Sequence, residues 1–135
     1  MKNVLFVCVE NSCRSQMAEA FFKKLAGCNL RGFSAGSKPS GIVNPLAIKV
    51  LKEKDIDISA AVSKGFAQLP IKQFDYVITM GCKDVCPLVP GKAKIDWQIP
   101  DPKDKDIAFF RIVRDAIEKQ VRALVAHICD DACGK

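Results

Sequence analysis

A short apolar run near the N-terminus passes directly into a loop of polar and cysteine residues, and this junction constrains the fold most. Val4-Leu5-Phe6-Val7 is rich in β-branched and aromatic residues, which is typical of a strand buried on both faces of a parallel sheet. Apolar residues then recur at helical spacing from Met17 to Leu25. The order of strand, loop and helix predicts an α/β fold whose ligands bind at the carboxyl ends of the strands.

The alternation of strand and helix patterns continues along the rest of the chain. Further strands are predicted at residues 30–35, at residues 74–80 and, as a short edge strand, at residues 94–96. Asn44 before Pro45 predicts the start of a second helix, and residues 106–129 carry the longest helical pattern. The 135 residues are a usual size for one domain. We therefore expect a single α/β domain over residues 1–135, with about 130–135 as a frayed tail.

Charge and cysteine content narrow the class of protein. The net charge of +6 is spread along the chain without a run of basic residues, so we expect a mildly basic surface rather than a nucleic-acid interface. Seven cysteines cannot all pair within one chain. No signal peptide or membrane-spanning stretch is visible. These features predict a cytoplasmic protein with mostly reduced thiols and no membrane partner.

The loop after the first strand has the features of an oxyanion site. Cys8 and Arg14 are separated by five residues, and a loop of that length can curl so that its N–H groups point inward, beside a helix N-terminus. Arg14 can bind two oxygens, and these surroundings favour the thiolate form of Cys8, a covalent nucleophile. Ser15 is predicted to cap the following helix. Without function, Cys8 would be a buried strand-end thiol and Arg14 a surface residue. The predicted oxyanion loop consists of Cys8, Val9, Glu10, Asn11, Ser12, Cys13, Arg14 and Ser15.

Several motifs carry a resemblance to a known family. C-V-E-N-S-C-R-S-Q-M-A-E-A at residues 8–20 resembles the start of the low-molecular-weight tyrosine phosphatase superfamily, and within it most resembles the thioredoxin-coupled arsenate reductases. Similar matches follow in order at residues 34–36, 44–48, 57–59, 74–80 and 101–102. The resemblance runs from residue 4 to about residue 121. It implies an α/β single domain with a four-stranded parallel sheet and flanking helices.

The resemblance also implies a chemistry and its residues. Asp101, before Pro102, would be the general acid that protonates the leaving oxygen. Cys8 would attack arsenate to form a thio-arsenate adduct, and Cys82 would attack Cys8, releasing arsenite and leaving a Cys8–Cys82 disulfide. Cys86 would then attack Cys82. Thioredoxin or a similar dithiol protein would reduce the final Cys82–Cys86 pair.

Two departures from the family keep alternatives open. Many relatives have glycine at the position of Glu10, so we expect the Glu10 carboxylate to point to solvent, away from the anion, with added strain if this position has a positive φ. Only three residues separate Cys82 from Cys86, fewer than in most thioredoxin-coupled relatives, which leaves the reductant and the use of Cys86 open. The second hypothesis is a low-molecular-weight protein tyrosine phosphatase using Cys8, Arg14 and Asp101. The third is a non-enzymatic module that signals by disulfide switching.

The remaining polar candidates are given no catalytic role. Cys13 could form a protective disulfide with Cys8, as in related phosphatases, or serve packing alone. Some arsenate reductases bind potassium near residues like Asn11 and Glu19, but here Lys64 stands where they carry an acidic residue, and its ammonium can replace the ion. We therefore expect no metal, no cofactor and a monomer. Residues without an assigned role are Cys28, His127, Cys129 and Cys133.

Overall fold

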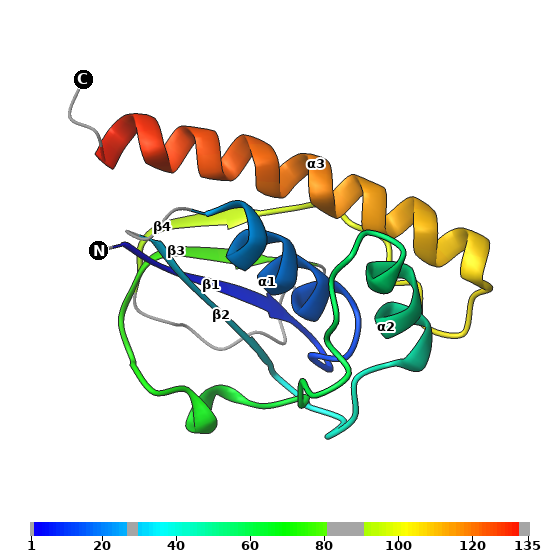
Figure 1. Cartoon of the computed structure of the whole chain (residues 1–135). Helices are drawn as coiled ribbons and strands as arrows, with labels where there is room; N and C mark the ends of the chain where they lie inside the picture. Colours follow the sequence, from blue (N-terminus) through cyan, green and yellow to red (C-terminus); the bar gives the residue numbers. More distant parts are fainter. Residues whose placement is uncertain (1, 27–29, 81–90, 133–135) are drawn as a thin grey trace.

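The computed structural model describes residues 2–26, 30–80 and 91–132 of the chain (Figure 1). Four parallel strands form one sheet in the order β2-β1-β3-β4, which confirms the predicted α/β fold and places β4 at an edge. The elements in chain order are β1 (Lys2–Cys8), α1 (Arg14–Leu25), β2 (Leu30–Gly36), α2 (Pro45–Lys52), the 3-10 helix η1 (Phe66–Gln68), β3 (Phe74–Thr79), β4 (Gly91–Asp96) and α3 (Ile107–Ala132).

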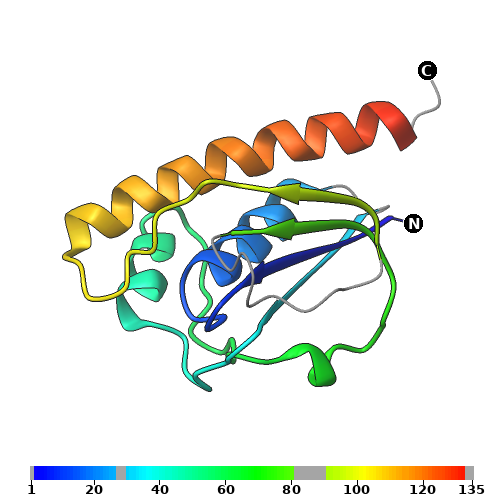
Figure 2. The same ribbon diagram turned by 180° about the vertical axis from the view of Figure 1, so that it is seen from behind.

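The first strand is central and is buried on both faces, as its continuous apolar run predicted. Val4 and Phe6 belong to a large core that also contains buried residues of α1, α2 and α3. Leu5 and Val7 point to the opposite face and belong to a second, smaller core. The α-helices α1, α2 and α3 therefore cover one face of the sheet. Figure 1 shows α1 in front of the strands, and Figure 2 shows it behind them.

The second face is covered by the connection between α2 and β3. Leu69 is buried there with Leu5 and Val7, while Phe66 and Ile71 pack against the same group. Figure 2 shows this connection, with η1, beside the sheet. Because both faces are covered, the strands can be apolar throughout, and polar chemistry is left to their ends.

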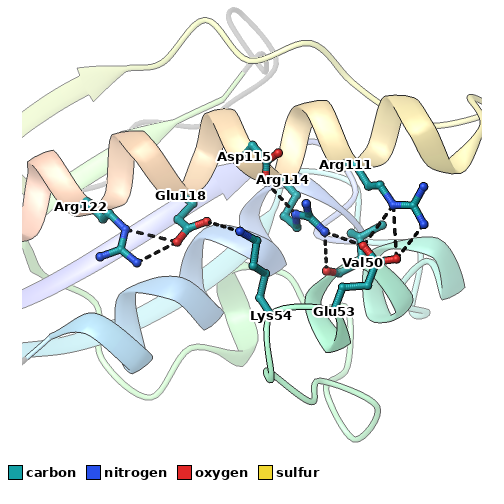
Figure 3. Close-up of polar contacts among 8 residues, drawn as sticks. All are labelled: Val50, Glu53, Lys54, Arg111, Arg114, Asp115, Glu118 and Arg122. Atoms are coloured by element: carbon teal, nitrogen blue, oxygen red, sulfur yellow. Dashed lines mark hydrogen bonds and ion pairs between the residues drawn. The ribbon is translucent and has the colours of Figure 1, made fainter.

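Ion pairs hold α2 and α3 together (Figure 3). The buried Arg114 guanidinium donates Nη1 to the Val50 carbonyl at 3.0 Å and to Glu53 Oε1 at 2.7 Å. Arg111 binds the same carboxylate, and its hydrogen bond is the main reason why the pKa of Glu53 falls to about 2. Glu53 therefore stays ionised at neutral pH and joins the end of α2 to α3.

Some predicted boundaries differ from the structure. The prediction that Ser15 caps α1 is wrong, because the helix already begins at Arg14 and its N-cap, Cys13, makes no side-chain cap bond. Asn44 does cap α2, since its Oδ1 accepts the Leu46 N–H at 2.9 Å. The last helix, α3, extends to Ala132, into the range where a frayed tail is expected. None of the helices in the described part of the chain is long and apolar enough to cross a membrane.

Candidate active site

The predicted oxyanion loop lies where β1 ends and α1 begins. Cys8 is the last residue of β1, and Arg14 is the first residue of α1. On the β2 side, Cys8 is paired with Gly36, and a Cβ atom added to Gly36 would lie only 2.5 Å from the Val9 carbonyl oxygen. Glycine at this position therefore lets the second strand run directly against the loop.

The carbonyl groups of the loop are bound from outside. The Val9 carbonyl accepts the Lys38 N–H at 2.8 Å, and the Ser12 carbonyl accepts the Asn44 N–H at 3.0 Å. The Glu10 carbonyl accepts two bonds, one of them from the Ser63 hydroxyl at 2.7 Å. Within the described ranges, no group accepts a hydrogen bond from the N–H groups of residues 10–14. These N–H groups, next to the N-terminus of α1, are thus available to an anion.

Asn11 fixes the sharpest bend of the loop. Its φ of 53° lies in the left-handed region, which asparagine tolerates better than most residues. Its buried side chain accepts bonds from Gln16 Nε2 at 2.8 Å and from the Lys64 N–H at 2.9 Å. The positive φ expected as a possible strain at Glu10 is therefore found one residue later. Sequence reasoning missed Gln16, although it belongs to the same motif.

Ser15 serves the Cys8 thiol rather than the helix terminus. Its Oγ lies 2.9 Å from Cys8 Sγ and accepts a bond from Asn11 Nδ2 at 2.7 Å. Because Asn11 supplies a donor, the Ser15 proton is free to point to the sulfur. A hydroxyl donating to sulfur stabilises negative charge there, which suits a thiolate nucleophile.

Arg14 and Asp101 complete the group around Cys8. Arg14 is buried, with Nη1 donating to the Ile99 carbonyl at 3.2 Å and Nη2 lying 3.5 Å from Asp101 Oδ2. Half of the Asp101 side chain is exposed. The structure therefore brings together three residues that the sequence analysis singled out. The pocket that they share is lined by Cys8, Glu10, Ser12, Cys13, Arg14, Asp101 and Lys103.

Glu10 does not simply point to solvent as expected. Its carboxylate forms an ion pair with Lys103, a residue for which we expected no role in the site. The contact joins residues 93 positions apart, and the only local signal was the place of Lys103 directly after the Asp-Pro motif. The carboxylate is thus neutralised by a neighbouring ammonium rather than by distance from the anion.

The Lys64 ammonium lies beside Glu19, as the sequence analysis expected. Its Nζ is 3.6 Å from Glu19 Oε1 and donates to Ser34 Oγ at 3.2 Å, while Ser34 also donates to Glu19. A cation of the protein itself therefore already neutralises this carboxylate. Among the described residues, no group of three or more His, Cys, Asp or Glu could hold a metal ion.

Cys82 and Cys86, like Cys28 and Cys133, lie outside the described residues. The strand that precedes the first two, β3, is the neighbour of β1 in the sheet. Their placement near Cys8 therefore stays a prediction from the sequence.

Cys13, the second thiol of the loop, lacks the thiolate form that a nucleophile needs. Burial is the main reason why its pKa rises to about 12, with smaller opposing contributions from a hydrogen bond to Ser12 and from Arg14. At neutral pH it is a protonated, inert thiol.

We predict that Cys13 stays unmodified by iodoacetamide between about pH 7 and 9, because its thiolate is almost absent in the folded protein. Peptide mapping by mass spectrometry after brief labelling measures this, and Cys8 in the same digest is the internal comparison. Labelling of Cys13 in urea is the control for detection. Equal labelling of Cys8 and Cys13 in the native protein would contradict this assignment.

Comparisons with known proteins agree with this geometry. The low molecular weight phosphotyrosine protein phosphatase family matches residues 3–132. An arsenate reductase of Staphylococcus aureus is 42% identical over 121 residues, which are 87% of this chain and 91% of the relative. A solved arsenate reductase in the phosphate binding state is 38% identical, with a TM-score of 0.84, and the match covers 95% of this chain and 99% of that one. A thioredoxin-dependent arsenate reductase of Corynebacterium glutamicum is 37% identical, with a TM-score of 0.79, and the match covers 97% of this chain and 63% of that one. The chain therefore belongs to the low molecular weight phosphotyrosine protein phosphatase family, and within it to the group that contains the arsenate reductases.

Proposed function

We propose that this protein is an arsenate reductase that converts arsenate to arsenite through a Cys8 thio-arsenate adduct. The observation that carries the proposal is the loop of residues 8–15. Hydrogen bonds from outside the loop bind the carbonyls of Val9, Glu10 and Ser12, and the loop residues Cys8 and Arg14 line one small pocket together with Asp101. The similarity to arsenate reductases over most of the chain supports the choice of arsenate as the oxyanion.

The first step requires a nucleophile, an anion clamp and an acid. The Cys8 thiolate attacks arsenic while the loop N–H groups and the Arg14 guanidinium bind the equatorial oxygens. Arg14 is already held by the Ile99 carbonyl, so little reorientation is needed when it exchanges Asp101 for the anion. Asp101 then protonates the departing oxygen, which leaves as water.

The reduction of arsenate to arsenite requires two electrons, and we propose that the thiols of Cys8 and Cys82 supply them. The Cys82 thiolate attacks the Cys8 sulfur, the sulfur–arsenic bond breaks, and its electron pair stays on arsenic, so that arsenite leaves after taking up a proton. A Cys8–Cys82 disulfide remains. Cys86 then attacks Cys82, frees Cys8 and leaves a Cys82–Cys86 disulfide, which a thioredoxin-like protein reduces. A thioredoxin-dependent relative supports this choice of reductant. The proposal includes a monomeric enzyme that acts in the cytoplasm.

A phosphatase is the second candidate, because the family that matches is named for that activity. Cys8, Arg14 and Asp101 would serve it equally well, with water in place of Cys82 at the second step. The geometry of Cys8, Arg14 and Asp101 suits both reactions. Experiments on Cys82 and Cys86 are therefore needed to distinguish a reductase from a phosphatase.

We predict steady arsenite production by the wild-type protein with arsenate, thioredoxin, thioredoxin reductase and NADPH. Cys8→Ser and Cys82→Ser should produce none, because the first cannot form the adduct and the second cannot transfer electrons to arsenic. Cys86→Ser should stop after about one arsenite per protein, with Cys8 trapped in a disulfide. Cys28→Ser is the matched control and should behave as wild type. Arsenite and the disulfides are measured by mass spectrometry.

Two outcomes of this experiment would count against the proposal. Undiminished arsenite production by Cys82→Ser would contradict the proposed transfer of electrons through the thiols. Rapid hydrolysis of an aryl phosphate by a wild-type protein that yields no arsenite would instead establish the phosphatase.

We also propose that Lys64 takes the place of a bound monovalent cation beside Glu19. The Lys64 ammonium contacts Glu19 and Ser34, and Lys23 pairs with the other oxygen of the Glu19 carboxylate. A further cation at this carboxylate would be repelled by these two ammonium groups. The residues present therefore do not fit a potassium ion.

The melting temperature of the wild type should accordingly be the same in potassium and sodium chloride at equal concentration. Lys64→Asp removes the ammonium and adds a carboxylate, so the variant should bind potassium at this place. Its melting temperature should be a few degrees higher in potassium than in sodium chloride, which corresponds to a stabilisation of about 1 kcal/mol by the bound ion. Lys72→Asp, on the connection before β3, is the control for a surface charge change. Potassium-specific stabilisation of the wild type would refute the replacement.

A further inference from the structure

Glu10 and Lys103 come from the two segments that border the oxyanion pocket. Glu10 lies in the loop between β1 and α1, whereas Lys103 lies between β4 and α3. Their side chains form an ion pair, and 33% and 50% of these side chains remain exposed. Both line the same pocket as Cys8 and Arg14. The pair, here called the Glu10–Lys103 pair, therefore lies at the boundary between the pocket and solvent.

The pair is coupled to the acid of the proposed reaction. The Lys103 N–H donates to Asp101 Oδ1 at 3.0 Å, and Asp101 Oδ2 lies 3.5 Å from Arg14. When the ion pair is formed, the turn that carries Asp101 is thus held on both sides, by Glu10 through Lys103 and by Arg14.

The pocket that the pair borders is narrow. Its free volume is about 10 Å³, which is room for about one water molecule, whereas the space between its walls that opens to solvent is about 220 Å³. A tetrahedral oxyanion needs more than the smaller volume, so we expect lining side chains such as the Glu10–Lys103 pair to shift when it enters. Such a shift of the pair is cheap because a half-exposed ion pair is weak.

The bound anion has one oxygen directed to this boundary. If the loop N–H groups and Arg14 bind three oxygens, the fourth lies opposite the Cys8 sulfur, in line with the attack, and faces Asp101. In an inorganic oxyanion this fourth oxygen is a hydroxyl or oxide, above which the pair can close again. In a phosphate ester the same oxygen carries the organic group, which has to pass through the place that the two side chains occupy.

We propose that the Glu10–Lys103 pair is a specificity determinant that favours compact inorganic oxyanions over phosphate esters. The proposal rests on the proposed function for the reaction at this site, and it explains how a loop that fits both substrate classes selects one. An ester keeps the pair apart for as long as it is bound. It thereby also loses the support that Lys103 gives to Asp101.

The opposite charges of the two residues make a clean test possible. The double variant Glu10→Gln/Lys103→Met removes one negative and one positive charge, so the net charge and the long-range attraction of anions stay unchanged. Lys105→Met, two residues further along the same segment, removes a positive charge without touching the pair and is the matched control. Glu10→Gln alone separates the effect of the carboxylate from that of the pair.

Dissociation constants of inorganic phosphate and phenyl phosphate are measured by calorimetry without any reductant, so that the result does not depend on whether the protein reduces arsenate. The wild type and Lys105→Met should prefer inorganic phosphate. In the double variant this preference should fall about threefold, mainly through tighter binding of the ester, which is the size of effect that a half-exposed ion pair can supply.

An unchanged preference in the double variant would overturn the proposal. Loss of inorganic phosphate binding by a double variant that melts like the wild type would also overturn it, because the pair would then be part of the anion clamp. A preference that falls equally in Lys105→Met would show that the effect does not depend on the pair, and would overturn the proposal as well.

Discussion

The outward binding of the loop carbonyls is the constraint on which the site depends. A peptide group that turns its oxygen away from a pocket turns its N–H toward it, so the bonds accepted by Val9, Glu10 and Ser12 determine where the N–H groups point. These bonds come from the segment after β2 and from Ser63, and Val43 of that segment is buried in the larger core. The anion site is therefore built by the whole fold rather than by the loop alone.

The surroundings of the two loop cysteines, and of the two glutamates near the loop, determine their different chemical states. Cys8 has a hydroxyl at 2.9 Å that can stabilise its negative charge, whereas burial keeps Cys13 protonated, with a pKa of about 12. Glu19 is paired with Lys64 and Lys23, and Glu10 is paired with Lys103. Both carboxylates thus have lysine partners and do not occupy the Arg14 guanidinium, which lies beside Asp101.

Much of this could be predicted from the sequence because it is local. The apolar run of β1, the spacing between Cys8 and Arg14, and the cap of α2 at Asn44 each depend on residues close together in the chain. The role of Ser15 could not be predicted, because it depends on the helix starting two residues earlier than a Ser15 cap would require. The contacts of Glu10 with Lys103 and with Ser63 join residues 93 and 53 positions apart. No periodicity or local motif signals such pairs, and only the folded sheet brings them together.

The most direct measurement is a crystal structure of the Cys8→Ser protein with arsenate. We predict that the arsenic lies above the residue 8 side chain, with oxygens within hydrogen-bond distance of the N–H groups of residues 10–14 and with the Arg14 guanidinium turned from Asp101 to the anion. Arsenate bound elsewhere, or a loop whose carbonyl oxygens point at the anion, would contradict this account of the site.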